Sequence, residues 1–131
     1  MSDPLIFATT HEVNEGELQR ITELSKEFSD LVETSDTGLL AFHFHLSADQ
    51  RTVSNLQVHR DAASMDAYLP IVGEKIAAAL ELSRTLTIDV FGEPGPVLRE
   101  VLRHNEEQGV HVRVLPTHLH GFTRGDAVAA A

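Results

Sequence analysis

The fold is decided by the stretch LLAFHFHLSADQRTVSNLQVH, residues 39–59. Leucine and phenylalanine occupy its even positions from 40 to 46, with alanine and histidine at the odd positions between them. Strict alternation of this kind is typical of a strand with one buried face. Residues 48–51, Ala-Asp-Gln-Arg, read as a polar turn, and apolar and polar residues alternate again up to residue 59. We therefore predict a β-hairpin with strands over 39–47 and 52–59.

The segments on both sides of the hairpin add strands and helices. Residues 5–11 are rich in β-branched and aromatic types and predict a strand. Apolar residues at helical spacing between 18 and 32 predict an amphipathic helix of about 18 residues, and Asn14 with Glu17 resembles a capping box at its start. After the hairpin, we expect Asp61 to cap a second helix. Pro70 should divide that helix near Leu69, because proline lacks the N–H and clashes with the preceding turn.

The remaining segments complete the order of elements. Residues 85–91 predict a strand, residues 92–96 a loop, residues 97–108 a helix and residues 110–115 a last strand. The order β-α-β-β-α-β followed by α-β predicts a single α+β domain over 1–131. We expect a ferredoxin-like core over 5–91, with antiparallel strands and helices on one face. Residues 92–124 would form an extension that lengthens the sheet or holds a partner subunit, and residues 125–131 a frayed tail.

Charge and composition narrow the range of partners. The net charge is −10, from 20 acidic against 10 basic residues, and no run of basic residues occurs. This balance disfavours nucleic acid and anionic membranes as partners, because both attract basic faces. The chain has no cysteine, hence no disulfide or thiolate chemistry. It shows neither a secretion signal nor an apolar stretch of about 20 residues, so we expect a cytoplasmic protein.

The alternation also predicts which strand residues face the helices. The leucines, phenylalanines and valines of the hairpin would do so, which leaves polar residues on the opposite face. That face would carry His43, His45, Asn55, Gln57, His59, Thr85, Thr87 and Asp89. Histidine and amide side chains hydrogen-bond with little fixed charge, which suits a semi-enclosed small-molecule cavity. Phe7, Thr9 and His11 share one parity and would add a mixed lining. A solvated sheet face is the alternative interpretation.

The stretch NLQVHRDAASMDAY, residues 55–68, together with the order of elements, resembles the antibiotic-biosynthesis-monooxygenase domains of the dimeric α/β-barrel superfamily. Asn55 matches the asparagine common on this strand in the family. His59 stands where the family often has an aromatic residue, and Tyr68 where it often has a helix histidine. The resemblance implies a homodimer whose two sheets pair face to face and enclose the polar face as a barrel.

The resemblance also implies an activity, the oxidation of a phenolic or quinol-like compound by O₂ without metal, flavin or other cofactor. A base would remove the phenolic proton and leave an anion that can reduce oxygen. Histidine suits this step, since its ordinary pKa is about 6.5. His43, His45 and His59 are the candidates for the base. The residues expected to bind the substrate are Asn55, Gln57, Thr87, Asp89 and Tyr68, with Asp89 also able to orient a histidine.

Two other functions stay open. The chain holds two His-x-His units, His43-Phe44-His45 and His118-Leu119-His120. Each could chelate a metal ion if it lies on a strand, with His59 or Asp89 as a third ligand, although no longer metal motif accompanies them. The departures from the family pattern at His59 and Tyr68 favour the other alternative, a dimeric module that binds a small ligand without catalysis.

Overall fold

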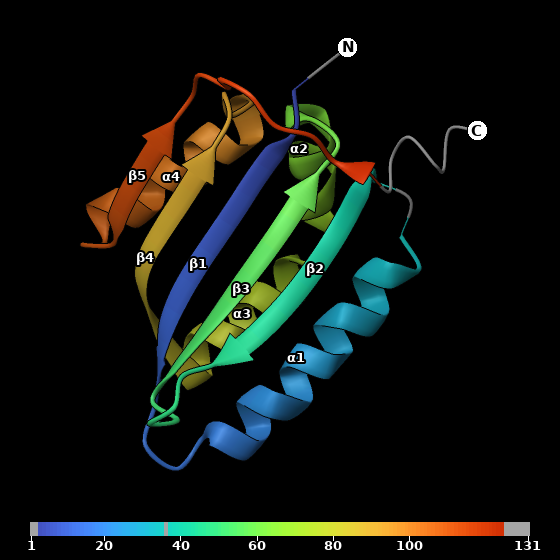
Figure 1. Ribbon diagram of the computed structural model, residues 1–131. Coiled ribbons are helices and arrows are strands. Elements are labelled where there is room, and N and C mark those ends of the chain that lie inside the picture. Colours follow the sequence, from blue (N-terminus) through green and yellow to red (C-terminus); the bar gives the residue numbers. More distant parts are fainter. Residues whose placement is uncertain (1–2, 36, 125–131) are drawn as a thin grey trace.

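The computed structural model describes residues 3–35 and 37–124, so the predicted frayed tail at 125–131 lies outside the described residues. The elements confirm the predicted α+β class and ferredoxin-like order (Figure 1). They are β1 (Leu5–Val13), α1 (Leu18–Glu33), β2 (Leu39–Leu46), β3 (Thr52–His59), α2 (Ala62–Ile71), α3 (Gly73–Leu82), β4 (Ser83–Phe91), α4 (Pro96–Glu107) and β5 (His111–Leu115).

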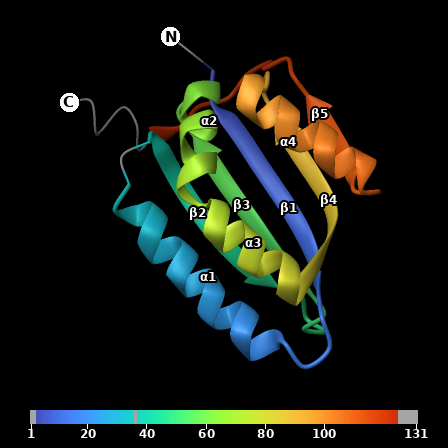
Figure 2. The ribbon, with the colours of Figure 1, turned by 180° about the vertical axis from the view of Figure 1, so that it is seen from behind.

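The strands form one five-stranded sheet in the order β2-β3-β1-β4-β5. The first four pair antiparallel, whereas β5 runs parallel to β4 and extends the sheet at that edge. All four described helices lie on one face of this sheet, as the two opposite views show (Figures 1 and 2). The other face, called the open face below, carries no described element, and the sheet does not close into a barrel within the chain.

The helix ends follow local sequence signals in one case and not in another. Asp61 caps α2 as predicted, because its carboxylate accepts the backbone N–H of Ser64 at 2.9 Å. Pro70 lies in the last turn of α2, and the helix breaks at Val72 into α2 and α3. The predicted capping box at the start of α1 is wrong, because it does not form. Asn14 donates instead to the backbone oxygen of Glu81 at 3.1 Å, and no side chain caps α1.

The hydrophobic core lies between the sheet and the helices. The buried stripe of α1 packs Phe28 against Phe42 and Phe44 of β2, with ring centroids 6.2 and 5.9 Å apart. Met65 of α2 and Leu98 of α4 are fully buried as well. Each such side chain contributes about 1.5–3 kcal/mol to stability when it is removed from water. The core therefore ties α4 to the same sheet face as the helices of the ferredoxin-like part.

The predicted face of β3 is wrong. Phe44 stands opposite Asn55, and His43 stands opposite Leu56. Residues directly opposite each other in an antiparallel pair share a face, so Asn55 faces the helices together with Phe44. Leu56 is correspondingly 44% exposed on the open face. The pairing register set by the turn, rather than the hydrophobicity of β3, decides which side chains lie under the helices.

Candidate functional site

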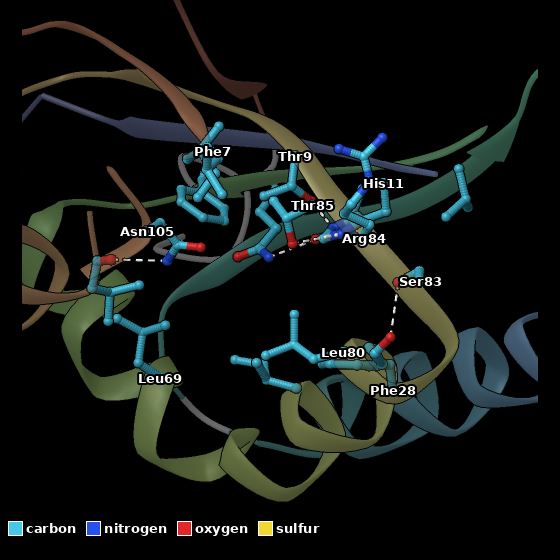
Figure 3. Close-up of a pocket in the computed structure, with 18 of the residues that line it drawn as sticks. Phe7, Thr9, His11, Phe28, Leu69, Leu80, Ser83, Arg84, Thr85 and Asn105 are labelled. Atoms are coloured by element: carbon cyan, nitrogen blue, oxygen red, sulfur yellow. Dashed lines mark hydrogen bonds between the residues drawn. The ribbon is translucent and has the colours of Figure 1, made fainter. Parts of the chain in front are cut away.

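A cavity of about 1060 Å³ lies between the helix-covered face of the sheet and helices α1, α2, α3 and α4. This volume is slightly above the usual range for small-molecule pockets, about 300–1000 Å³. Strands β1, β3 and β4, with Phe44 of β2, form the sheet side of the cavity (Figure 3). The apolar part of the lining includes Phe7, Leu24, Phe28, Phe44, Ile76 and Val101. An apolar lining with a few polar groups is typical of a site for an aromatic or aliphatic compound.

The first polar group of the cavity is built on β3 and α2. Asn55, Gln57 and Tyr68 all line the cavity. The amide nitrogen of Gln57 donates to Asn55 Oδ1 at 2.6 Å and to Tyr68 Oη at 3.1 Å. Buried polar side chains need such partners, since an unpaired one would cost about 1–3 kcal/mol. The cap at Asp61 starts α2 at the point that brings Tyr68 over β3.

Two further residues support this group from behind. His59 is fully buried, and its Nε2 lies 2.8 Å from Gln57 Oε1 while its Nδ1 lies 2.8 Å from Ser64 Oγ. Its ring also meets the ring of Tyr68 edge-on, with centroids 5.5 Å apart. His59 is not among the cavity-lining residues. It therefore acts on the cavity through Gln57 and Tyr68 rather than by contact with a bound molecule.

Burial sets the protonation of both rings. It lowers the pKa of His59 to about 4, against an opposing effect of the nearby Asp61 carboxylate. It raises the pKa of the Tyr68 phenol above its ordinary range, partly offset by the hydrogen bond from Gln57. At neutral pH His59 is therefore a neutral imidazole and Tyr68 a protonated phenol.

The second polar group lies on β1 and β4. His11 Nε2 is 2.9 Å from Thr9 Oγ1, and His11 Nδ1 is 3.1 Å from Thr85 Oγ1. The register between β1 and β4 shifts between Thr10 and His11, so that Thr85 stands opposite His11. All three side chains line the cavity (Figure 3). Burial lowers the pKa of His11 to about 4, so the ring is a neutral base at neutral pH.

The predicted site residues are divided by the sheet. Asn55, Gln57 and Tyr68 meet at the cavity, with His59 behind them. The other predicted residues lie on the open face: His43, His45, Thr87 and Asp89. There the rings of His43 and His45 are 6.3 Å apart, and Asp89 forms an ion pair with Arg113 at 2.9 Å. The expectation that these residues share one face is wrong, because the hairpin register inverts β3.

The sequence placed His11 and Thr85 in the expected cavity lining, but neither was predicted as a catalytic or substrate-binding residue. His11 shares its parity with Phe7 and Thr9, so the alternation of the first strand was a signal for it. Thr85 was expected beside Thr87 on the polar face. The shift in register turns it toward the helices instead. No sequence pattern marks this shift, because a bulge depends on how two distant strands meet.

Two further features bear on the alternatives. Within residues 3–35 and 37–124, no group of three or more histidine, aspartate or glutamate side chains is arranged to hold a metal ion. His118 Nδ1 lies 3.7 Å from Asp3 Oδ1, and His120 is exposed after β5. In the same part of the chain, no helix has the length and apolar character needed to cross a membrane.

Neither a protein-family model nor a curated protein matches the sequence. Solved structures do match. SnoaB, a cofactor-independent oxygenase from Streptomyces nogalater, aligns with a TM-score of 0.62 at 14% identity over 73% of this chain and 98% of its own. A putative antibiotic biosynthesis monooxygenase from Chloroflexus aurantiacus aligns with a TM-score of 0.59 at 14% identity, over 92% of this chain and 100% of its own. The chain has the antibiotic-biosynthesis-monooxygenase-like fold.

This monooxygenase-like fold includes the extension in some of the similar structures. MupZ from Pseudomonas fluorescens aligns with a TM-score of 0.73 at 15% identity, over 95% of this chain and 98% of its own. That alignment leaves too few residues unmatched to omit α4 and β5. In the present chain α4 supplies Val101 and Asn105 to the cavity, so the extension forms part of the cavity wall.

Proposed function

We propose that this protein oxidises a phenolic or quinol-like small molecule with O₂, without a resident metal or flavin, in the cavity beneath its helices. The observation that carries the proposal is a neutral imidazole, that of His11, in a large apolar cavity beside two threonine hydroxyls. The likeness in fold to a cofactor-independent oxygenase supports the reaction type. An aromatic substrate suits the phenylalanine and aliphatic lining.

His11 would remove the phenolic proton. The resulting anion would stabilise the imidazolium beside it and so raise the pKa of His11 from its low value in the free cavity. One electron passes from the phenolate to O₂, and the radical and superoxide combine at a ring carbon to form a C–O bond. The proton on His11 then goes to the peroxide. Loss of water, with the proton of that ring carbon, leaves a quinone, so that phenol and O₂ yield quinone and water.

The open face would serve assembly rather than catalysis. We propose that it pairs with the open face of a second copy, as the resemblance implies. Its exposed apolar residues support this, with Leu56 at 44% and Leu115 at 42% exposed. The cavity lies on the helix side of the sheet and takes its lining from one chain. The dimer would therefore hold two separate sites, and not one polar barrel interior.

Oxygen uptake tests the proposal directly. The purified protein, treated with a chelator, would be given a panel of anthrones, naphthols and quinols in an oxygen electrode. A substrate of the panel should be turned over. His11→Gln, which can still hydrogen-bond Thr9 and Thr85, should lower the rate about 100-fold or more. The matched control is His120→Gln, an exposed histidine after β5, which should leave the rate unchanged.

The other outcomes identify the alternatives. Binding of panel members without oxygen uptake would indicate a non-catalytic ligand-binding module. Loss of uptake in His43→Gln or His45→Gln, with His11→Gln still active, would move the chemistry to the open face. Activity that disappears on chelation and returns with an added metal ion would replace the cofactor-independent reaction with a metal-dependent one.

A further inference from the structure

We propose that Tyr68 presents its O–H to the bound ligand as an obligate donor. The buried hydrogen-bond chain Ser64–His59–Gln57 fixes this direction of donation. The site would therefore select a ligand oxygen that accepts, a ring carbonyl or an oxyanion, over a hydroxyl that must donate. The inference rests on the proposed function only in taking the cavity as the binding site. It adds the class of oxygen that is recognised and the residues that set this preference.

The argument starts from a group whose role cannot change. The backbone carbonyl of His43 can only accept, and Asn55 Nδ2 lies 3.1 Å from it. The Asn55 amide is thereby oriented, and its Oδ1 faces Gln57. The Gln57 atom 2.6 Å from that oxygen must be the NH₂ group. The amide of Gln57 is therefore oriented as well, without any assumption about hydrogen positions.

The orientation of Gln57 decides the roles of its other neighbours. Its NH₂ group also lies 3.1 Å from Tyr68 Oη, so the phenol oxygen accepts this bond. Its Oε1 lies 2.8 Å from His59 Nε2, which must then carry the proton. His59 Nδ1 is left as an acceptor, and Ser64 Oγ donates to it at 2.8 Å. The donor and acceptor atoms of all five side chains are thus fixed in a single connected hydrogen-bond network.

Tyr68 ends this network with one proton unused. Its oxygen already accepts from Gln57, and among residues 3–35 and 37–124 it has no other hydrogen-bond partner. The side chain lines the cavity and is held edge-on against His59 and 6.2 Å from the ring of Phe42. Burial raises the pKa of the phenol, so the proton stays on the oxygen. The remaining direction for this O–H is toward a molecule in the cavity.

Reversal of this sense would require several groups to change together. If Tyr68 were to donate to Gln57, the Gln57 amide would have to rotate by half a turn. Its NH₂ group would then face the N–H of His59, and its oxygen would face the oxygen of Asn55. Both pairs repel, and both lie in the interior, where unpaired polar groups are costly. A ligand hydroxyl can still accept from Tyr68, but a ligand that offers only donors finds no acceptor there.

Three ligands of one shape test the inference under anaerobic conditions: 9-fluorenone, 9-hydroxyfluorene and fluorene. Calorimetric or fluorescence titration should show fluorenone binding roughly three- to tenfold tighter than fluorene, the range for one neutral hydrogen bond. Tyr68→Phe should abolish this preference without weakening the binding of fluorene. Thr10→Val removes a hydroxyl from the open face, where Thr10 bonds Ser54 at 2.8 Å, and should keep the preference. A preference that survives Tyr68→Phe overturns the inference.

Two further measurements address the chain that fixes the sense. In ¹⁵N NMR spectra, His59 should be the Nε2–H tautomer; an Nδ1–H tautomer overturns the inference whether or not any variant folds. Gln57→Glu places an oxygen opposite Tyr68 Oη and also opposite Asn55 Oδ1, so it should lower stability. In the folded variant the new acceptor should turn the Tyr68 O–H inward and make 9-hydroxyfluorene the tighter ligand. An unchanged order of affinities in folded Gln57→Glu also overturns it. If the protein passes these tests but takes up no oxygen, the proposed oxygenase function is wrong and the role of Tyr68 as a donor stands. If it takes up oxygen but fails these tests, the oxygenase function stands and the role of Tyr68 is wrong.

Discussion

Asp66 Oδ1 accepts the backbone N–H of Leu98 at 3.0 Å, so a side chain of α2 caps the N-terminus of α4. The other oxygen of Asp66 accepts the N–H of Val97 at 3.3 Å. Helix α4 has no side-chain cap of its own, because Gly95 precedes it. The carboxylate also meets the positive end of the helix dipole. Asp66 thereby ties the extension to the core and holds in place the helix that forms one wall of the cavity.

Loss of this cap should destabilise the protein. Asp66→Ala removes the acceptor for two N–H groups, and we expect it to lower the free energy of unfolding by about 1 kcal/mol. Asp66→Asn should cost less, since asparagine caps almost as well. Urea unfolding followed by circular dichroism measures both. Asp30→Ala is the matched control, because Asp30 forms only an exposed ion pair with Lys26 on α1. Equal losses at the two positions would contradict the role of Asp66.

Gly95 is required by the same contact. A Cβ built at this residue would lie 2.3 Å from Asp66 Oδ2, although the φ of −80° suits any residue. Gly95→Ala should therefore cost about 1–3 kcal/mol through crowding alone. This cost should largely vanish in the Asp66→Ala background, which a double-mutant cycle measures. Gly73→Ala is the control, since a Cβ there meets nothing within 4 Å. A cost that persists without the Asp66 side chain would show that crowding is not the cause.

Stability should fall as the solution is acidified from pH 7 to pH 5. Burial lowers the pKa values of His11 and His59 from 6.5 to about 4. Between pH 6.5 and pH 4 these histidines are protonated in the unfolded chain but not in the folded protein. Their contribution to the free energy of unfolding is therefore complete above pH 6.5 and is lost on acidification toward pH 4. Each histidine accounts for about 2 kcal/mol between pH 7 and pH 5. His59→Gln should roughly halve this dependence, and His120→Gln should leave it intact. An unaltered slope in His59→Gln would contradict the buried neutral ring.

Local patterns were enough to predict most of the fold. Alternation located the strands, Asp61 marked the start of α2, and Pro70 marked its interruption. These features depend on residues a few positions apart. The site was harder, because β3 presents amides and a histidine under the helices while Leu56 faces outward. The hydrogen-bond partners of these buried polar side chains, Tyr68 and Ser64, lie on α2. Hydrophobic alternation within one strand cannot predict partners on another element.

The open face offers a direct test of assembly. Leu56 is 44% exposed at the middle of this face, opposite Ala8 of β1 and His43 of β2. If two copies pair through it, Leu56→Arg buries a charge in the interface and should convert the dimer to a monomer. Light scattering after size-exclusion chromatography measures the mass. Ile71→Arg, at a residue 41% exposed on α2, is the control and should stay dimeric. A monomeric wild type would remove the proposed dimer.

The last prediction concerns the wall that the extension adds to the cavity. Val101 of α4 lines the cavity, whereas Val97, one turn earlier on the same helix, does not line it and is 41% exposed. Val101→Phe fills space that a ligand would occupy, and the cavity is large enough to accept the ring without overpacking. We expect at least about tenfold weaker binding of fluorenone, roughly 1.4 kcal/mol, with little change in stability. Val97→Phe should bind as the wild type does. Equal affinities in the two variants would place the ligand away from α4 and confine the site to the ferredoxin-like core.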